Sequence, residues 1–220
     1  MTNERIAETK IRRPDNFHIR PLDKTTWPDF ARLAEKHNGV WGGCWCMAFH
    51  LERGFGNRTA RQNRADKECR VRKGKAHAAL VFDGAIAVGW CQFGPTHELP
   101  RIKNKKAYLE GLVNLPDWRI TCFFVDRDYR GQGVAALALQ GALGEISRLG
   151  GGIVESYPED VVGRSVSASF LHNGTLAMFE RAGFRRSRPL GKNHWLVTKL
   201  VRKSSRKGPR GHAPREPRPH

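Results

Sequence analysis

The segment with the most specific chemistry is a glycine-containing loop, Arg130-Gly-Gln-Gly-Val-Ala135, which lies between an apolar run and an Ala- and Leu-rich run. The apolar run, which ends at Val125, predicts a strand, and the run after the loop predicts a helix. The first amides of a helix have no partner inside the helix, and the helix dipole adds positive charge there. Gly131 and Gly133 let an anion approach the main chain without a Cβ in the way, and Arg130 adds a charge. The pattern therefore predicts an anion site at the start of a helix.

Two common nucleotide-binding motifs do not fit this loop. The dinucleotide motif needs a third glycine shortly after Gly133, but position 136 is Ala136 and the next glycine is Gly141. The loop also lacks the Gly-Lys-Ser/Thr ending of a phosphate-binding P-loop. Since many strand-to-helix turns carry glycine for packing alone, the loop by itself does not say which anion is bound.

The loop and a second segment together resemble the motifs of the GNAT superfamily of acyl-CoA-dependent N-acetyltransferases. The cofactor motif of that family is Arg/Gln-x-x-Gly-x-Gly/Ala, which reads Arg130-Gly-Gln-Gly-Val-Ala135 in this chain. Members often carry Asn-x-x-Ala-x-x-Tyr before a Gly-Phe pair, and here Asn173-Gly-Thr-Leu-Ala-Met-Phe179 precedes Gly183-Phe184. The order of expected elements extends the resemblance from Phe17 to about Val201.

This resemblance implies a mixed α/β fold of the acyl-CoA N-acyltransferase type, whose mostly antiparallel sheet is splayed at two parallel strands and flanked by helices. It implies acetyl-CoA as co-substrate and direct transfer of the acetyl group to a small-molecule or peptide amine. The pantetheine arm would lie beside the strand that ends at Val125, and a main-chain N–H there would polarise the thioester carbonyl. The residues that the resemblance assigns to the cofactor are Phe124, Val125, Arg130, Gly131, Gln132, Gly133, Val134, Ala135 and Asn173.

The chain departs from the family pattern at two positions. Phe179 stands where members often carry the Tyr that protonates the departing CoA thiolate. Phe cannot donate a proton, so another donor or water serves, or the thiolate leaves unassisted, which is plausible for a thiolate near neutral pH. Leu176 replaces the small Ala of the pattern, which is a packing change.

The general base is not fixed by the sequence. An amine must be neutral to attack a thioester, so a carboxylate, a histidine or a relayed water is expected. Glu155 is the only charge in its apolar run, and Glu98 follows the end of a predicted strand; His97 and Asp117 are further candidates. The plainer alternative is that Glu155 faces solvent from a strand and that Glu98 is a solvated loop residue.

An aromatic, turn-rich stretch, Trp41-Gly-Gly-Cys-Trp-Cys-Met-Ala-Phe49, precedes the second predicted helix. Trp41, Trp45 and Phe49 are candidates for lining the acceptor pocket, with plain core packing as an equal alternative. Two cysteines in this stretch lack a second Cys or His pair at the spacing that zinc sites use, so no metal is expected. Cys122 lies within an apolar strand and is a poor candidate for a nucleophile.

The remaining patterns place these segments on a sheet with helices. Asp83-Gly84 between two apolar runs predicts a hairpin with a type I′ turn, in which both central residues have positive φ. A strand–helix–strand unit in the middle of the chain implies a partly parallel sheet. The predicted strands are 17–23, 77–82, 85–93, 119–125, 153–157, 184–188 and 194–201, and the predicted helices are 27–37, 59–72, 107–112, 136–149 and 173–182.

Composition and charge bound the class of protein. The chain has 220 residues and a formal net charge of +18, with 39% hydrophobic residues. No apolar run approaches the roughly 20 residues of a membrane span, the N-terminus has no signal-like apolar region, and five scattered cysteines do not form a disulfide framework. We expect a cytoplasmic protein with a loose segment 1–16, an acetyltransferase domain 17–201 and a disordered basic tail 202–220.

The positive charge offers an alternative function. The tail contains seven Lys or Arg and one Glu, and a second basic stretch runs from Arg53 to Lys75. Such charge attracts polyanions, so the fold could be a scaffold that associates non-specifically with nucleic acid through its tail. The tail contains no aromatic residue for base stacking, which argues against sequence-specific binding. The oligomeric state stays open, with a homodimer as one alternative.

Overall fold

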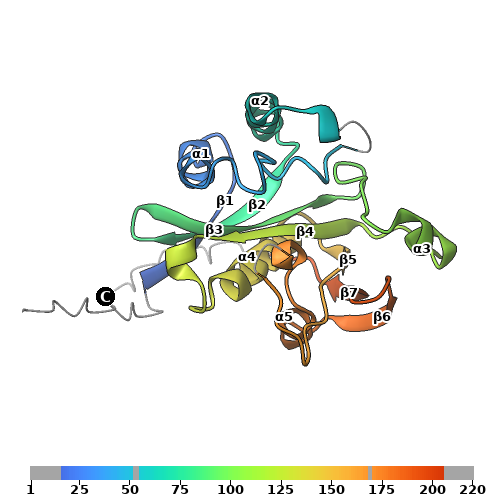
Figure 1. Ribbon diagram of the computed structural model, residues 1–220. Helices are drawn as coiled ribbons and strands as arrows, with labels where there is room; N and C mark the ends of the chain where they lie inside the picture. The colour runs from blue at the N-terminus through green and yellow to red at the C-terminus, as the bar shows by residue number, and fades with distance from the viewer. Residues whose placement is uncertain (1–15, 52–54, 168–169, 206–220) are drawn as a thin grey trace, which may run out of the picture.

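The computed structural model describes residues 16–51, 55–167 and 170–205 (Figure 1). The strands are β1 (Phe17–Pro21), β2 (His77–Asp83), β3 (Ile86–Pro95), β4 (Trp118–Val125), β5 (Gly152–Ser156), β6 (Arg185–Pro189) and β7 (Trp195–Val201). The helices are α1 (Trp27–Lys36), α2 (Ala60–Arg72), α3 (Lys105–Glu110), α4 (Val134–Arg148) and α5 (Leu176–Arg181). Short 3₁₀ turns are η2 (Phe55–Asn57), η3 (Arg127–Tyr129) and η4 (Leu171–Asn173).

The seven strands form one sheet in the order β1-β2-β3-β4-β5-β7-β6. The strand pairs are antiparallel except for β4 and β5, which are parallel and are joined through α4. This connection is the strand–helix–strand unit that the sequence predicts. The predicted fold class, a mixed α/β fold with a mostly antiparallel sheet and one parallel pair, is confirmed.

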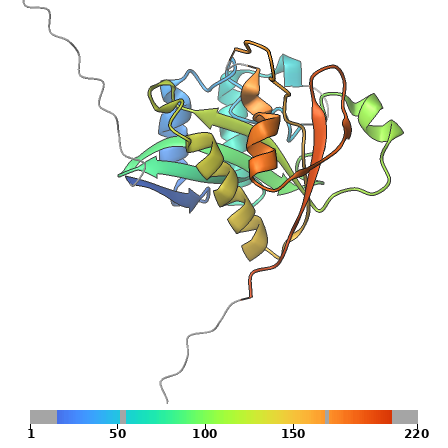
Figure 2. The same ribbon diagram turned by 90° about the horizontal axis from the view of Figure 1, so that it is seen from below.

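Helices cover both faces of the sheet. Figure 1 shows α1 and α2 on one side and α4 and α5 on the other, and Figure 2 shows α4 crossing the sheet beside α5. Each face has its own buried apolar cluster, and β4 contributes to both because successive side chains of a strand point to opposite faces. Cys122 and Phe124 pack with α1, whereas Phe123 packs with α4 and α5.

The two parallel strands separate after a short pairing. Only residues 118–120 of β4 pair with β5, opposite Val154 to Ser156, whereas β4 pairs with β3 out to Val125. Among the described residues, therefore, no strand pairs with the remaining edge of β4 on the β5 side. This is the splay that the family resemblance implies, and it opens towards the start of α4.

Two local predictions need correction. The hairpin turn consists of Gly84 and Ala85, and only Gly84 has positive φ (56°), so the turn is not type I′. The predicted helix 173–182 starts later, at Leu176, because Thr175 caps α5 by accepting a hydrogen bond from the Met178 amide. Asn173 lies before it in η4.

Three further predictions concern the chain ends, membrane spans and the basic stretch around α2. Residues 1–15 and 206–220 lie outside the described residues, so the loose N-terminal segment and most of the basic tail stay predictions. Within the described ranges, no helix combines the length and the apolar character that crossing a membrane requires. In the basic stretch around α2, Arg58, Arg64 and Arg72 form ion pairs with acidic neighbours.

Candidate active site

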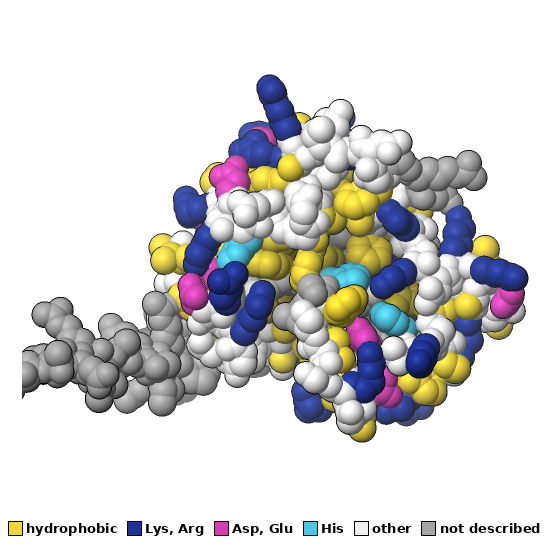
Figure 3. Space-filling view, viewed as in Figure 1, with side chains coloured by type: hydrophobic (Ala, Val, Ile, Leu, Met, Phe, Trp, Pro, Cys, Tyr) yellow, Lys and Arg dark blue, Asp and Glu magenta, His cyan; other side chains and the backbone are white. Residues whose placement is uncertain are grey.

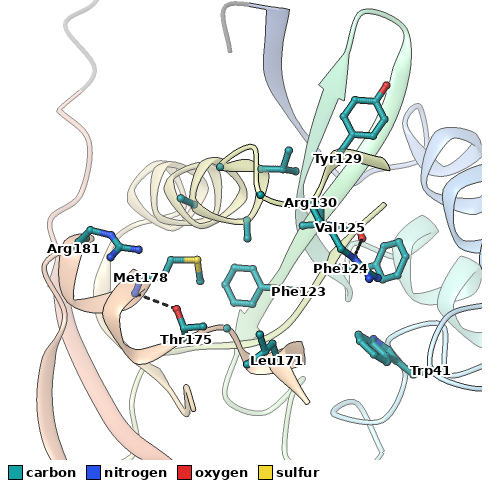
Figure 4. Close-up of a pocket in the computed structure, with 16 residues that line it drawn as sticks. Trp41, Phe123, Phe124, Val125, Tyr129, Arg130, Leu171, Thr175, Met178 and Arg181 are labelled. Atoms are coloured by element: carbon teal, nitrogen blue, oxygen red, sulfur yellow. Dashed lines mark hydrogen bonds between the residues drawn. The ribbon is translucent and has the colours of Figure 1, made fainter. Parts of the chain in front are cut away.

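A first cavity, which we call the cofactor cavity, opens where β4 separates from β5. Its volume is about 440 Å³. Figure 4 shows its walls: the end of β4, the loop to α4, and the segment from Leu171 to Arg181. The lining residues are Trp41, Phe123, Phe124, Val125, Tyr129, Arg130, Gly131, Gly133, Val134, Ala135, Ala136, Leu171, Gly174, Thr175, Met178 and Arg181.

The glycine loop forms the anion-binding end of this cavity. Gly131 and Gly133 have φ values of 75° and 79°, the left-handed region that favours glycine, and a Cβ at either position would meet no atom within 4 Å. The space beside both residues is therefore open to a ligand. Helix α4 begins directly after Gly133, so its first amides face this end of the cavity. Arg130 and, from the opposite wall, Arg181 add positive charge.

The free edge of β4 presents main-chain groups to the same cavity. The Asp126 amide donates to the Val88 carbonyl of β3 at 2.9 Å. Because main-chain groups of successive strand residues point to opposite sides, the N–H and C=O of Val125 point away from β3, into the splay. In agreement, the Arg130 Nε donates to the Val125 carbonyl at 3.4 Å. The Val125 N–H is thus placed to bind a carbonyl oxygen or an oxyanion in the cavity.

Gly89 of β3 allows the glycine loop and the first turn of α4 to pack closely against the sheet. A Cβ on this β3 residue would lie 2.8 Å from the Phe124 carbonyl oxygen and 2.8 Å from Val134 Cγ1. Both contacts are shorter than van der Waals distance, so a larger residue would push the first turn of α4 away from the end of β4. The sequence does not indicate this role, because Gly89 lies in an ordinary apolar strand pattern.

Three residues with family-derived roles lie outside the cofactor cavity. Gln132 turns away, and its side-chain amide donates to the Asp128 carbonyl at 3.1 Å. Asn173 is buried and donates to the Tyr157 carbonyl at 3.4 Å, while its neighbour Gly174 lines the cavity. Phe179 is fully buried, with its ring edge-on to Phe123 at a centroid distance of 5.9 Å, so it faces the core.

A second cavity, which we call the acceptor cavity, adjoins the first and has a volume of about 360 Å³. Trp41 lines both cavities. In addition, two pairs of chain neighbours are divided between them: Phe123 and Leu171 line the cofactor cavity, whereas Cys122 and His172 line the acceptor cavity. Figure 3 shows hydrophobic side chains gathered in a hollow of this face, with His and Lys or Arg side chains around it. The lining residues are Trp41, Cys44, Cys46, Ala48, Phe49, Phe55, Arg101, Lys103, Cys122 and His172.

The aromatic stretch reaches this cavity through an unusual backbone. Val40, Trp41, Trp45 and Cys46 have φ values between 44° and 52°, a left-handed conformation that costs non-glycine residues about 1 kcal/mol or more each. Trp41 and Phe49 line the acceptor cavity. Trp45 turns inwards instead, is 3% exposed, and packs against Trp27 with ring centroids 6.2 Å apart. Strain of this kind is typical of functional sites.

His172 is a candidate site residue that the sequence did not indicate. Its ring lies 6.1 Å from that of Trp41 and 6.3 Å from that of Phe49, measured between centroids. It comes from η4, directly after Leu171 of the cofactor cavity, and lines the acceptor cavity beside Trp41, which both cavities share. An imidazole can accept a proton near neutral pH, which makes His172 a candidate general base.

Neither predicted carboxylate lines either cavity. Glu155 is 4% exposed, which excludes the solvent-facing alternative, and its carboxylate accepts a hydrogen bond from the Tyr157 hydroxyl. Burial raises its pKa. Glu98 pairs with His77 at 3.3 Å, and its carbonyl contacts His50 Nδ1 at 2.9 Å. Both carboxylates are therefore held by structural partners away from the cavities.

A buried polar cluster supports the wall behind the acceptor cavity. Lys67 of α2 is 1% exposed, and its ammonium donates to Gln92 Oε1 at 2.5 Å and lies 3.2 Å from His50 Nε2. Burial lowers the pKa of Lys67 to about 8. Gln92 in turn donates to Thr121 Oγ1 of β4 at 3.1 Å. The cluster ties α2 to the two central strands.

Three thiols reach the acceptor cavity, and two of them are in contact. Cys46 Sγ lies 2.9 Å from Cys122 Sγ, and the Trp90 indole N–H donates to Cys46 Sγ at 3.2 Å. Burial opposes ionisation of Cys46, but the hydrogen bond from Cys122 and the charge of Lys67 lower its pKa overall. Over the described ranges, no group of His, Cys, Asp and Glu side chains is arranged to hold a metal ion.

No family model matches the sequence, and no curated protein matches it. Among solved structures, it is similar to an N-acetyltransferase from Staphylococcus aureus Mu50, at 14% identity and a TM-score of 0.48, over 85% of this chain and 99% of that one. It is also similar to yncA from Salmonella typhimurium with its cofactor acetyl-CoA (14%, TM-score 0.49, 86% and 96%). A third is the ribosomal-protein-S18-alanine N-acetyltransferase from Escherichia coli (11%, TM-score 0.43, 87% and 97%). At these levels the similarities assign neither a family nor an activity to this chain.

Proposed function

We propose that the protein is a GNAT-type N-acetyltransferase that binds acetyl-CoA in the cofactor cavity and transfers the acetyl group directly to an amine in the acceptor cavity. The observation that carries the proposal is the continuity of the free β4 edge with the glycine loop. A pantetheine arm needs main-chain partners along an extended path, and a diphosphate needs free amides at its end. Both are present on adjoining walls of one cavity.

The cofactor would be held chiefly by main-chain groups. The diphosphate would lie on the amides of residues 131–135, with Arg130 and Arg181 beside it. The pantetheine would follow the edge of β4, and the Val125 N–H would bind the thioester carbonyl and stabilise the oxyanion that forms on attack. Phe124 lines the cavity from the same end of β4. Gln132 and Asn173 would act by holding the loop and η4 in shape rather than by touching the cofactor.

The proton of the acceptor would go to His172. An amine arrives mostly as its ammonium ion, so one proton must leave before the nitrogen lone pair can attack the carbonyl carbon. The new C–N bond forms as the carbonyl electrons move to oxygen, the nitrogen then releases a second proton to water, and collapse of that intermediate breaks the C–S bond. The CoA thiolate leaves without a Tyr donor, because Phe179 carries no hydroxyl, and takes its proton from water or from the imidazolium of His172.

Two measurements test this function. Calorimetry should detect binding of acetyl-CoA at micromolar concentration, and a thiol-release assay with a panel of amines should detect free CoA that depends on the amine. Absence of cofactor binding at high micromolar concentration would overturn the proposal. Binding without release for any amine class would limit the chain to a cofactor-binding role.

The cytoplasmic location and the nucleic-acid association of the basic tail remain proposals of lower priority. The tail hypothesis rests on the charge of residues 202–220 alone. Deletion of residues 206–220 should abolish any salt-dependent binding to nucleic acid and leave acetyl-CoA binding unchanged. If the full chain shows no such binding, the alternative fails.

A further inference from the structure

The acceptor cavity combines an aromatic interior with a positively charged rim. Arg101 and Lys103, from the connection between β3 and α3, line it beside Phe55. The Arg101 guanidinium lies 5.6 Å from the centre of the Phe55 ring, and its main-chain N–H donates to the Phe49 carbonyl at 3.3 Å. This bond and the ring contact fix the arginine at the wall of the cavity.

Neither cation is neutralised by a carboxylate within the described part of the chain. Other arginines of the molecule, such as Arg58 and Arg164, are paired with acidic side chains. Two cations without a carboxylate partner among the described residues, beside an apolar hollow, favour a ligand that supplies negative charge. It disfavours a ligand with several positive charges, which the same field would repel.

On the basis of the proposed function, we propose that the acceptor is an amine that carries both a flat apolar body and an anionic group, with a carboxylate as the best fit. Trp41, Phe49 and Phe55 would contact the apolar body, and the cavity volume of about 360 Å³ suits a molecule the size of an aromatic amino acid. Arg101 and Lys103 would bind the anion. The amine would lie towards Trp41 and His172, where the two cavities meet.

The test compares amines that differ only in the carboxylate: phenylalanine with phenethylamine, tryptophan with tryptamine, and 4-aminobenzoate with aniline. A polyamine and an aminoglycoside complete the panel, and free CoA is measured with a fixed concentration of acetyl-CoA. We expect the carboxylated member of at least one pair to have the higher kcat/KM by about tenfold, as a charge-assisted hydrogen bond predicts. Preference for the polyamine or the aminoglycoside would overturn the proposal.

Two double variants distinguish a specific effect of Arg101 and Lys103 from a general effect of the protein's net charge. Arg101→Gln with Lys103→Gln should lower kcat/KM about tenfold for the carboxylated amine and less than twofold for its neutral partner. Lys24→Gln with Lys73→Gln removes the same charge from exposed positions elsewhere and should change neither. Equal loss for both amines, or no loss, would overturn the proposal. Calorimetry with acetyl-CoA distinguishes failure of this proposal from failure of the proposed function. If only the acceptor proposal is wrong, the protein still binds acetyl-CoA; if the proposed function is wrong, it does not.

A second inference rests on a different observation, the contact between two thiols. The loop residue Cys46 and the β4 residue Cys122 have their sulfur atoms 2.9 Å apart, and both line the acceptor cavity. A disulfide needs about 2.05 Å, so the two sulfur atoms lie within about 1 Å of bonding distance. A peroxide is small enough to enter a cavity of this size, although both thiols are buried.

We infer that Cys46 and Cys122 form a peroxide-sensitive pair that closes to a disulfide and alters the acceptor cavity. The Cys46 thiolate attacks one peroxide oxygen, the O–O bond breaks, and water leaves with the proton of the thiol, which yields a sulfenic acid. The Cys122 thiol then attacks the sulfenic sulfur, the S–S bond forms, and a second water leaves. The product ties the strained loop that carries Trp41 to β4.

Peptide mapping after treatment with hydrogen peroxide tests this pair. The linked peptides of Cys46 and Cys122 should appear, with a mass about 2 Da below the sum of the free peptides, and thiol release should fall severalfold and recover with dithiothreitol. Cys46→Ser and Cys122→Ser should each abolish the link, whereas Cys69→Ser, at an exposed cysteine, should not. Detection of no link, or of links that involve only Cys69, would overturn the inference.

Discussion

The two cavities on either side of Trp41 are built in different ways. Most residues that line the cofactor cavity come from one continuous stretch, from Phe123 to Ala136, and the groups proposed to hold the cofactor are mainly main-chain amides of that stretch. The acceptor cavity is bounded by side chains from four separate segments, and its chemical groups are cations, aromatic rings, a histidine and thiols. A main-chain site suits a ligand that is the same in every reaction cycle. A side-chain site can change with the acceptor while the fold stays constant.

The first prediction concerns the residue at the junction. His172→Gln keeps a polar group of similar size but cannot accept a proton as a base, so kcat should fall by about 10²- to 10⁴-fold. The acidic limb of the pH–rate profile, which a histidine base produces, should disappear. Steady-state kinetics from pH 5 to 9 measure the effect on catalysis, and calorimetry with acetyl-CoA measures the effect on cofactor binding. An unchanged pH profile would remove His172 from the mechanism.

The second prediction tests the main-chain site. Gly133→Ala places a Cβ in the space that the diphosphate would occupy, so the Kd for acetyl-CoA should rise by about a hundredfold, or nearly 3 kcal/mol. The left-handed φ should cost about 1 kcal/mol of stability, and the protein should stay folded. Gly144→Ala, in α4 with open space around it, is the matched control and should leave the Kd unchanged. Equal Kd values would place the diphosphate elsewhere.

The sequence predicts the two cavities unequally for a physical reason. Strand, loop and helix follow one another around Arg130–Ala135, so a local pattern indicates both the element order and the chemistry. His172, Arg101 and Cys122 come together only through the sheet order, which no local pattern contains. Trp45 shows the same limit, because left-handed φ values, not its residue type, turn it into the core.

The predicted secondary structure succeeded where apolar periodicity was long and failed at element ends. Helix α4 and the hairpin β2–β3 were within two residues of their predicted bounds. The start of α5 was misplaced because Asn173 and Thr175 are both good cap residues, and only the hydrogen bond to Met178 distinguishes them. Glu155 was correctly identified as an unusual strand charge, but its partners Tyr157 and Tyr108 explain its burial without a role in either cavity.

The third prediction concerns the buried lysine behind the acceptor cavity. Below pH 8 Lys67 is protonated in both the folded and unfolded states, and the folded state bears the full cost of burying the charge. Between pH 8 and the ordinary lysine pKa near 10.4, only the unfolded chain retains the proton, so stability rises with pH. From pH 7 to 9.5 the rise from this group should be about 2 kcal/mol.

Lys67→Met isolates this contribution. Urea unfolding of the wild type and the variant at both pH values should show the rise in the wild type only, after subtraction of the changes that both proteins share. Lys73→Met, at an exposed lysine, is the control and should behave as the wild type. If Lys67→Met keeps the same pH dependence, the side chain titrates normally and the polar cluster is more hydrated than its contacts indicate.

The smallest expected effect is at Phe179, the position where the family often carries Tyr. Because the ring is fully buried, lines neither cavity, and packs edge-on against Phe123 and Phe184 at centroid distances of 5.9 and 4.9 Å, a hydroxyl on it would be buried. Phe179→Tyr should therefore lower stability by about 1 to 3 kcal/mol through an unsatisfied hydroxyl and change kcat less than twofold. Thermal unfolding and thiol release measure the two effects. A rise in kcat of tenfold or more would contradict this placement and would mean that the ring reaches the leaving sulfur. The wild-type thiolate would then leave unassisted only because Phe179 lacks a hydroxyl.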